Sequence, residues 1–543
     1  MQLARALGYS LLLLSLAGAC YIPSQPPTTV ASAERPGSSV YVASHAAARA
    51  ELERQPSALL DAEALLRDPD EFSSPASSVK KPVKVSAVSS PTEAAAPSSE
   101  GTSPARRAFS GLSVSEQTLR AQRRQRLSGL PPIPPDSDLE DPSGRALFPF
   151  FDSLQRVAAL EQGSQTRVVQ LGDSHTAADF MTSKLRHVLQ ARFGDAGRGF
   201  LYPGRAFKYY YQRDVKHGGT GPWEVQNGLR ADAREPLGLG GFRLTASTPE
   251  ARIYVGTCDD CESNRVVSAF ELFFWQRPGA GWLQVAVDGA PVRVIDTAEG
   301  SSPERLEGET GVYRLELPEG PHKLEAWPTG DLPVDLFGVV LERDVPGVTL
   351  DALGINGATL QTSARWTWSL ATEQLQRRDP ALLITWYGTN ESGSRDFSVP
   401  SYEQVWRDQL SRLRRMVPDS ACLVVGPPDR LMRPSSQCKP RKDRRGRPLP
   451  LGPQCRWRTA ELLDPIIDVQ RRVAFEQGCA FWDVRRFMGG AGAMNLWVEQ
   501  TPPLAQADRV HLTRDGYERV GQAIATDLID EYERFVSATQ PSP

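Results

Sequence analysis

Residues 168–180 read VVQLGDSHTAADF, and this stretch decides the fold class. The β-branched, apolar residues before Gly172 are typical of a buried strand, and the residues after Ser174 have the spacing of a helix. A turn from a parallel strand into a helix lies at the carboxyl edge of the sheet, where α/β proteins bind their ligands. Ser174 could act as a nucleophile there, but Ser174 or Thr176 could equally cap the helix.

The alternation of strands and helices continues on both sides of this turn. A helix-like pattern precedes it, and the later runs ALLITWYG, CLVVGPP and CAFWDV are typical of parallel strands, with a closing amphipathic helix in DGYERVGQAIATDLIDEYERF. Between residues 206 and 344 short strand-like runs replace this pattern, and Asp288-Gly289 between alternating valines predicts a type I′ hairpin. We therefore expect an α/β domain, residues 146–205 and 345–543, interrupted by an all-β, jelly-roll-like domain at 206–344.

The first 20 residues, MQLARALGYSLLLLSLAGAC, form a predicted export signal. A short positive region precedes an apolar run that is too short to span a bilayer. Small residues directly before Cys20 resemble the lipobox of bacterial lipoproteins, although Ala17 stands where that motif usually has leucine. Lipidation of Cys20 is one interpretation, and a secretory signal with an incidental cysteine is the other. By the sorting rules of Gram-negative bacteria, Tyr21 favours the periplasmic face of the outer membrane.

Residues 21–145 are rich in proline, alanine and serine and have few large apolar side chains, so we expect a disordered tether. The net charge of −3 gives no reason to expect nucleic-acid binding. If Cys20 carries lipid, six cysteines remain, a number suited to disulfides in an oxidising compartment. Fifteen pairings are possible, and three local pairs are the simplest prediction. These are Cys258 with Cys261, Cys422 with Cys479, and Cys438 with Cys455.

Asp508 and His511 lie three residues apart in ADRVHLTRDGY, directly before the closing helix. A carboxylate at this spacing can accept a hydrogen bond from histidine Nδ1 and leave Nε2 free as a base. An exposed turn with an unrelated aspartate and histidine is the alternative. Of the six histidines, His511 is the one placed to act as the base, and His175, beside the serine, should project to the opposite side.

Two further segments follow expected strand ends. Asn390 in WYGTNES could donate its side-chain amide to an oxyanion, and Gly357 in LGINGATL could donate its backbone N–H. An Asx turn and an ordinary loop glycine are the alternatives. With a serine and a histidine, these donors would complete the parts that serine hydrolysis needs.

Four blocks of the sequence, taken in order, resemble the GDSL/SGNH hydrolase superfamily. They are Gly172-Asp173-Ser174, Gly357, Gly388-Thr389-Asn390 and Asp508-x-x-His511. The resemblance implies a flavodoxin-like three-layer α/β/α domain in which Ser174 is the nucleophile, His511 the base and Asp508 its orienting acid. It also implies an oxyanion hole made by the N–H groups of Ser174 and Gly357 and by Nδ2 of Asn390.

Longer stretches resemble the bacterial peptidoglycan O-acetylesterase branch of that superfamily, among them GDSHTAADF, FGDAGRGFLYPG, WYGTNES and DRVHLTRDGY. Members of that branch carry a β-sandwich similar to a family 35 carbohydrate-binding module after the first helix of the catalytic domain, where the insert lies here. The resemblance covers nearly everything from residue 146 onward. The basic loop at residues 438–455 looks like an addition that could reshape the cleft.

The resemblance implies a serine esterase that removes O-acetyl groups from cell-envelope glycan, with peptidoglycan as the first candidate. An O-acetyltransferase with the same triad is one alternative, since only the acceptor differs. A non-catalytic, glycan-binding surface lipoprotein is another, although aromatic residues of a sandwich are more often core than sugar platform. The aromatic residues concerned are Trp223, Trp275, Trp282 and Trp327.

The expected partners are O-acetylated peptidoglycan or another envelope polysaccharide, and a membrane reached through lipid at Cys20. We expect no cofactor, because neither a phosphate-binding glycine loop nor a metal-ligand cluster stands out. The lone CxxC has no second pair of zinc ligands, which favours a short disulfide over zinc. Asp259, Asp260 and Glu262 beside it could hold calcium, but a solvated acidic turn explains them more simply.

Overall fold

The computed structural model describes residues 138–539, except 209, 231, 302–307, 331, 434–442 and 448–454. The predicted export signal with Cys20, nearly all of the predicted tether, and Cys438 lie outside the described residues. Within the described residues, we find no helix with the length and apolar character needed to cross a membrane.

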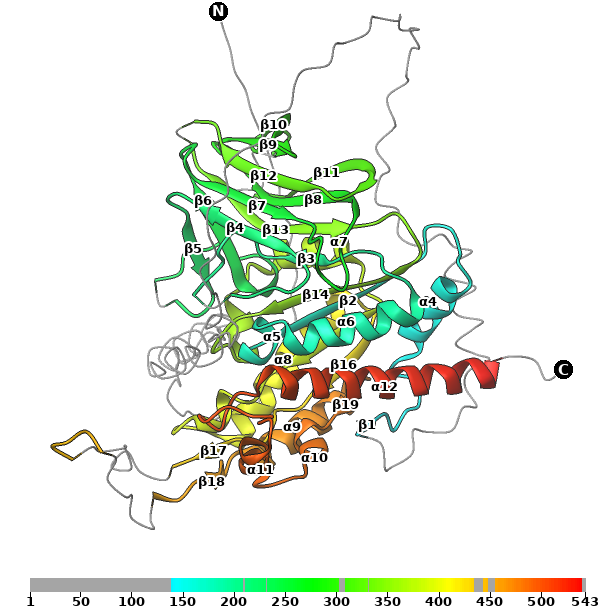
Figure 1. Ribbon diagram of the computed structural model, residues 1–543, viewed down its shortest axis with the longest axis vertical. Coiled ribbons are helices and arrows are strands. Elements are labelled where there is room, and N and C mark those ends of the chain that lie inside the picture. Colours follow the sequence, from blue (N-terminus) through cyan, green and yellow to red (C-terminus); the bar gives the residue numbers. More distant parts are fainter. Residues whose placement is uncertain are drawn as a thin grey trace, which may run out of the picture. The chain divides into compact units, whose positions relative to one another are not determined.

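A six-stranded sheet forms the centre of the α/β domain (Figure 1). In spatial order its strands are β1 (Leu139–Glu140), β19 (Ala480–Trp482), β16 (Ala421–Val425), β15 (Leu382–Trp386), β2 (Gln165–Gly172) and β14 (Gly347–Gly354). All neighbours pair in parallel except β1, which runs antiparallel to β19. Leu139 is buried in this sheet, so ordered structure begins before the predicted boundary at residue 146. The Pro-rich composition around this short edge strand concealed it.

Helices cover both faces of the central sheet. On one face lie α4 (Phe148–Ala158), α6 (Phe180–Phe193) and α12 (Arg514–Thr539), and on the other α7 (Trp368–Arg378), α8 (Val399–Met416) and α9 (Leu463–Glu476). The strands alternate between the two layers: Leu382 and Ile384 of β15 face the first, and Leu383 faces the second. The continuous apolar runs in the sequence therefore belong to strands buried on both sides. This arrangement is the expected three-layer α/β/α fold.

Shorter helices, 3₁₀ turns and one small ladder complete the described elements outside the larger sheets. They are the helices α5 (Ser174–Ala177), α10 (Val484–Met488) and α11 (Ala493–Glu499), the 3₁₀ turns η4 (Leu239–Gly241), η5 (Leu360–Arg365) and η6 (Glu391–Gly393), and the two-stranded ladder β17 (Leu431–Met432) with β18 (Arg458–Thr459). The sequence predicts one helix after Ser174, but the chain breaks it at Asp179, whose φ is +52°. Asp179 accepts hydrogen bonds from the Arg213 backbone and the Arg198 side chain, so distant residues hold it in this conformation.

Two antiparallel sheets form the β-rich region between α6 and β14. One contains, in order, β10 (Ala290–Asp296), β9 (Trp282–Val287), β12 (Lys323–Pro328), β7 (Arg252–Gly256) and β4 (Lys216–Thr220). The other contains β11 (Glu309–Gly320), β8 (Val267–Gln276), β13 (Val334–Glu342), β6 (Phe242–Ala246) and β5 (Glu224–Asn227), with β3 (Gly199–Leu201) also paired to β13. Side chains of both sheets share one core. Asp288 and Gly289, between β9 and β10, both have positive φ, as a type I′ turn requires.

The β-rich region joins the α/β domain through paired strands and buried charges. It was predicted to begin at residue 206, yet β3 already hydrogen-bonds to β13. At the junction the buried Arg378 donates to Asp351 at 2.7 Å and lies 2.8 Å from Glu342, so three elements meet in one ion network. Neighbouring cations outweigh the effect of burial and hold the pKa of Glu342 below its usual range.

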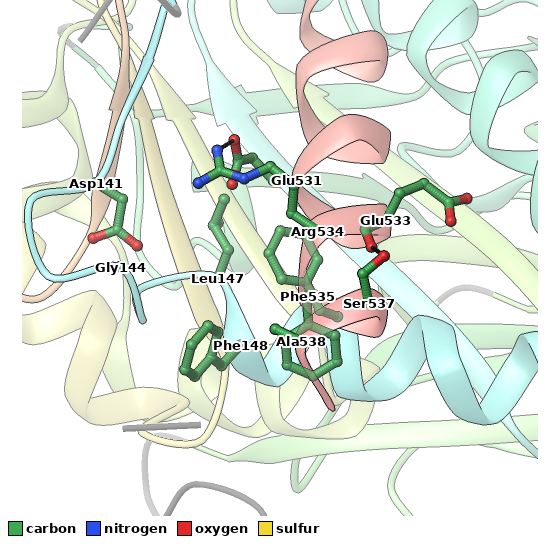
Figure 2. Close-up of a pocket in the computed structure, with 11 residues that line it drawn as sticks. Asp141, Gly144, Leu147, Phe148, Glu531, Glu533, Arg534, Phe535, Ser537 and Ala538 are labelled. Atoms are coloured by element: carbon green, nitrogen blue, oxygen red, sulfur yellow. Dashed lines mark hydrogen bonds and ion pairs between the residues drawn. The ribbon is translucent and has the colours of Figure 1, made fainter. Parts of the chain in front are cut away.

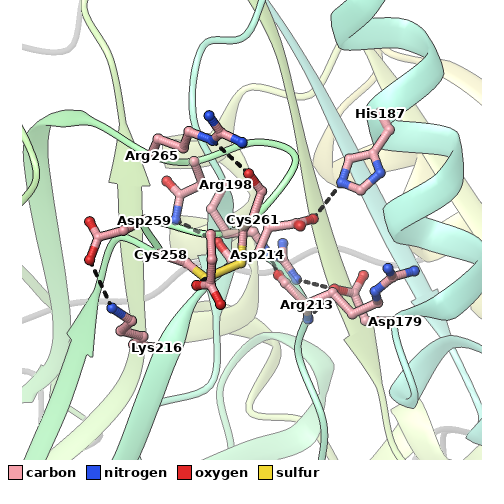
Figure 3. Close-up of a disulfide and its surroundings, with 12 residues drawn as sticks. Asp179, His187, Arg198, Arg213, Asp214, Lys216, Cys258, Asp259, Cys261 and Arg265 are labelled. Atoms are coloured by element: carbon pink, nitrogen blue, oxygen red, sulfur yellow. Dashed lines mark hydrogen bonds and ion pairs between the residues drawn. A yellow bond between two sulfur atoms is a disulfide. The ribbon is translucent and has the colours of Figure 1, made fainter.

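A second charged network lies beside the Cys258–Cys261 disulfide (Figure 3). His187 on α6 lies 2.6 Å from Asp214 through Nε2 and 2.9 Å from Glu262 through Nδ1. Since Glu262 directly follows the disulfide, this contact holds the disulfide loop against α6. The structure also joins Cys422 on β16 to Cys479 before β19, across neighbouring strands.

Candidate active site

The turn that follows β2 places Ser174 at the carboxyl edge of the central sheet. Gly172 ends the strand, and a Cβ there would lie 2.1 Å from Thr176 Oγ1, so only glycine fits this tight turn. Asp173 then caps α5, because its side chain accepts the His175 backbone N–H at 2.9 Å. The cap is thus supplied by Asp173, which leaves the Ser174 hydroxyl free of the capping role that the sequence allowed.

The loop before α12 brings His511 to this serine. Ser174 Oγ lies 3.0 Å from His511 Nε2, and His511 Nδ1 lies 2.8 Å from Asp508 Oδ2. The other oxygen of Asp508 accepts the backbone N–H groups of Val510 and His511 at 2.9 and 3.1 Å, which fixes the carboxylate in the turn. The intervening Arg509 has a φ of +60°, and this conformation lets both ends of the four-residue turn converge.

The charge state of Asp508 determines the tautomer of His511. Burial opposes ionisation of Asp508, but the hydrogen bond and charge of His511 and the two backbone donors outweigh it, and the pKa of Asp508 lies below its ordinary value. An ionised carboxylate can only accept, so Nδ1 of His511 carries the proton and Nε2 presents its lone pair to Ser174 Oγ. This arrangement can withdraw a proton from the serine hydroxyl.

The two predicted oxyanion donors lie on adjoining loops. Gly357 has a φ of +85°, and Asn390 Nδ2 donates to the carbonyl of the next residue, Ala358, at 2.8 Å. The same nitrogen lies 3.4 Å from Asp173 Oδ2, so its second hydrogen is directed toward the turn that holds Ser174. The Asn390 amide is therefore fixed between the two loops rather than free to rotate.

His175 does not project to the opposite side, as the sequence suggested. Its ring centre lies 5.5 Å from that of His511, it stacks on Trp386 at 5.2 Å, and its Nδ1 lies 2.9 Å from the Tyr517 hydroxyl. Burial, together with the charges of His511 and Arg430, lowers the pKa of His175 well below its ordinary value. A neutral imidazole therefore packs behind the site, because the tight helical turn of α5 directs it there rather than away.

Two charged residues of the site were not identified from the sequence. Glu391 is buried and accepts the Gly388 N–H at 3.1 Å, and burial raises its pKa to about 7. Arg430 donates to the Thr389 carbonyl at 2.6 Å. Their positions in the sequence could have identified them, because each is a charged residue a few positions after a predicted buried strand.

The residues considered for metal binding have other partners. Both cysteines of the CxxC are joined in the disulfide, so neither offers a thiolate. Asp259 lies 3.1 Å from the Lys216 ammonium, and Glu262 contacts His187. Asp260 alone is left beside the disulfide sulfurs. The described residues therefore form no set of ligands suited to zinc or calcium at this place.

The tryptophans considered as a sugar platform differ in their surroundings. Trp275 and Trp223 pack against the core, and Trp327 is covered by the Arg252 guanidinium, whose carbon lies 4.0 Å from the ring centre. Trp282 is the exception, with 52% of its surface exposed.

A cavity of about 490 Å³ lies elsewhere, between the segment that precedes α4 and the C-terminal end of α12 (Figure 2). Apolar side chains of Leu147, Phe148 and Phe535 line it together with Arg534. None of the predicted catalytic or oxyanion residues contributes to it.

Comparison with known proteins adds to this geometry. Residues 324–519 match the GDSL-like Lipase/Acylhydrolase family, a range that holds Gly357, Asn390, Asp508 and His511 but not Ser174. A solved structure of a peptidoglycan O-acetylesterase is similar with 26% identity and a TM-score of 0.57, covering 73% of this chain and 99% of that chain. A family two carbohydrate esterase from Clostridium thermocellum matches with 11% identity and a TM-score of 0.24, covering 62% of this chain and 98% of that one. No curated protein matches the sequence.

Proposed function

We propose that this chain is a serine esterase of the GDSL-like lipase/acylhydrolase kind that removes O-acetyl groups from peptidoglycan through Ser174, His511 and Asp508. The observation that carries this proposal is the unbroken path from Ser174 Oγ to His511 at 3.0 Å and from His511 to Asp508 at 2.8 Å. Residues 337 positions apart meet here with hydrogen-bonding geometry, which a helix cap would not require.

In the first step His511 Nε2 takes the proton of Ser174 as its Oγ attacks the acetyl carbonyl carbon. A tetrahedral oxyanion forms, and its collapse breaks the bond to the sugar oxygen, which leaves with the proton from His511. Water then attacks the acetyl-serine, His511 takes the proton of that water, and collapse of the second intermediate releases acetate and restores the Ser174 hydroxyl. Asp508 stays ionised throughout and stabilises the imidazolium.

The backbone N–H groups of Ser174 and Gly357 and the amide of Asn390 are the proposed oxyanion donors. Asn390 Nδ2 is held in place by its 2.8 Å hydrogen bond to the Ala358 carbonyl, and its second hydrogen, which has only the 3.4 Å contact with Asp173, is the one that would turn to the oxyanion. We expect Asn390→Ala to lower kcat on the order of 10²–10³-fold, as the loss of one such donor does elsewhere. Measurement of kcat with p-nitrophenyl acetate tests this, and an unchanged kcat would remove Asn390 from the site.

The choice of peptidoglycan is supported by the similarity to a peptidoglycan O-acetylesterase over nearly the whole of that protein. The direct test is release of acetate from O-acetylated peptidoglycan compared with the same material treated with base, which removes the esters. Wild type should release acetate only from the first, Ser174→Ala should release none, and Ser537→Ala on the exposed end of α12 should match wild type.

Each other result has a definite meaning. Acetate release by a folded Ser174→Ala enzyme would refute the assignment of the nucleophile. Hydrolysis of p-nitrophenyl acetate without release from peptidoglycan would refute the substrate. Transfer of acetyl groups to an added chitooligosaccharide, in place of release, would make the protein an acetyltransferase with the same triad.

The proposal extends to location, with Cys20 lipidated and the enzyme held at the periplasmic face of the outer membrane. Its support is the predicted export signal and the small residues before Cys20, which lie outside the described residues. Expression of wild type and Cys20→Ala with radiolabelled palmitate tests this proposal. Label should enter only the wild-type chain, and equal labelling of both would refute it.

A further inference from the structure

The segment that follows β16 contacts both loops of the proposed active site. The Arg430 side chain donates to the Thr389 carbonyl, next to Asn390, and the Leu431 backbone N–H donates to the Arg509 carbonyl at 3.0 Å. Arg509 itself lies between Asp508 and His511. The strand β17, which begins at Leu431, is therefore tied to the loop that carries the proposed base.

This segment leads into the ladder β17–β18 (Figure 1), and the register of the ladder places two further residues next to each other. Leu431 pairs with Thr459 and Met432 with Arg458, so Arg433 and Trp457 are the next residues on opposite strands. The guanidinium carbon of Arg433 lies 4.4 Å from the centre of the Trp457 ring, and that of Arg509 lies 4.6 Å from the same ring. We call Arg433, Trp457 and Arg509 the arginine–tryptophan platform.

The platform adds positive charge to the loop that carries His511, because Arg509 belongs to that loop. Arg509 donates through Nε to Asn495 Oδ1 and through Nη1 to the Ala507 carbonyl, both neutral oxygens, and we find no ion pair for it among the described residues. Burial, followed by the like charge of Arg433, lowers the pKa of Arg509. An anion placed against the Arg509 guanidinium would relieve both effects on Arg509, because it restores the interactions that water and a counter-charge would otherwise supply.

Among the residues that the structure describes, the acidic neighbours of Arg509 do not supply this counter-charge. Asp508 is committed to His511 and to the backbone of its own turn. The charge of Glu499 raises the pKa of Arg509, but the two side chains form no salt bridge. Arginine is also the side chain that best matches the two oxygens of a carboxylate, and the ring of Trp457 holds both guanidiniums in place through cation–π contact.

Building on the proposed function, we propose that the arginine–tryptophan platform binds a carboxylate of the glycan while its acetyl ester lies against Ser174. The platform would select acidic, O-acetylated glycans over neutral ones. In peptidoglycan such a carboxylate stands either on the lactyl group of a muramic acid without peptide or on the stem peptide. Both sources present the same chemistry to the two guanidiniums.

The test compares substrates that differ only in charge. O-acetylated peptidoglycan fragments are divided, and one half is coupled to ammonia with a carbodiimide at mildly acidic pH, which converts carboxylates to amides and leaves the esters in place. We expect wild-type kcat/KM to be about 10-fold higher for the carboxylate form, mainly through KM, and the difference to shrink in 0.5 M NaCl. Fragments with and without stem peptides distinguish the two sources of carboxylate.

Variants assign this preference to the platform. Arg433→Gln should bring the ratio of the two kcat/KM values close to one, and Arg433→Glu should reverse the preference. Arg252→Gln is the matched control, because Arg252 also lies over a tryptophan, Trp327, but on β7 of the β-rich region. That variant should keep the wild-type ratio.

The outcomes separate this proposal from the proposed function. If wild type releases acetate equally from the carboxylate and amide forms, the platform proposal is refuted and the esterase assignment stands, a result that needs no variant to fold. If Arg433→Gln keeps the full preference, the carboxylate is bound elsewhere. If neither form yields acetate, the proposed substrate itself is wrong.

Discussion

Replacement of Asp508 by asparagine probes how the site controls the proton on His511. Asparagine keeps an acceptor oxygen for the Val510 and His511 N–H groups, so the turn can persist, but its amide nitrogen would face His511 Nδ1 as a donor. His511 would then have to accept at Nδ1 and carry its proton on Nε2, which faces Ser174 Oγ. A protonated Nε2 cannot take the proton of the serine hydroxyl.

We expect Asp508→Asn to lower kcat on the order of 10³–10⁴-fold, the size of effect associated with the wrong tautomer in a triad. The assay is hydrolysis of p-nitrophenyl acetate, with thermal unfolding to show that the variant is folded. Asp515→Asn is the matched control, because it removes a nearby carboxylate from an exposed position at the start of α12. A folded Asp508→Asn enzyme with more than a tenth of the wild-type kcat would refute this account of the site.

Further predictions concern stability. Since burial raises the pKa of Glu391 to about 7, the folded protein binds a proton there that the unfolded chain releases near pH 4.5, and stability should fall as pH rises between these values. Glu391→Gln should therefore raise the free energy of unfolding by about 1–3 kcal/mol at pH 8 and leave it unchanged at pH 4. Denaturant titrations at the two pH values measure this difference. An equal gain in stability at both pH values would contradict the prediction. Removal of the Cys422–Cys479 disulfide, which spans 57 residues, should cost about 4 kcal/mol, whereas removal of Cys258–Cys261 with its separation of 3 should cost about 1–2 kcal/mol. Denaturant titrations of variants in which each cysteine pair is replaced by alanine test which disulfide contributes more to stability. Equal losses of stability in the two variants would contradict the prediction.

The architecture was largely predictable because its signals are local. Continuous apolar runs identified strands buried on both faces, and the Asp288-Gly289 turn identified a hairpin from two residues whose positive φ values the structure shows. An α/β domain with a β-rich region in its chain followed from the change in period between these runs, and the family resemblance implied its three layers. The predicted pairs Cys258–Cys261 and Cys422–Cys479 are both present as disulfides.

The differences arise where distant residues act together. The helix after Ser174 breaks at Asp179 because Arg198 and the Arg213 backbone, from the next part of the chain, hold that carboxylate. The junction network of Glu342, Asp351 and Arg378 likewise joins residues whose positions in the sequence carry no shared pattern.

In the candidate site, too, the sequence predicted some features and others depend on contacts between distant residues. Its residues were predicted from four short blocks, but the direction of the His175 ring and the burial of Glu391 depend on packing that only the folded chain creates. The partners of Arg430 at the Asn390 loop could not be inferred either, because they depend on where β16 delivers the chain.

The separation of Ser174 and His511 by 337 residues has a consequence for biosynthesis. A chain that ends before His511 carries the proposed nucleophile but no base, so every unfinished or truncated copy should be inactive toward esters. In the folding protein, activity can return only after the parts of the α/β domain before and after the β-rich region have come together, with α12 packed against α6. Ester hydrolysis therefore reports the assembly of the α/β domain, and during refolding it should never precede the amide protection of β2 and β14.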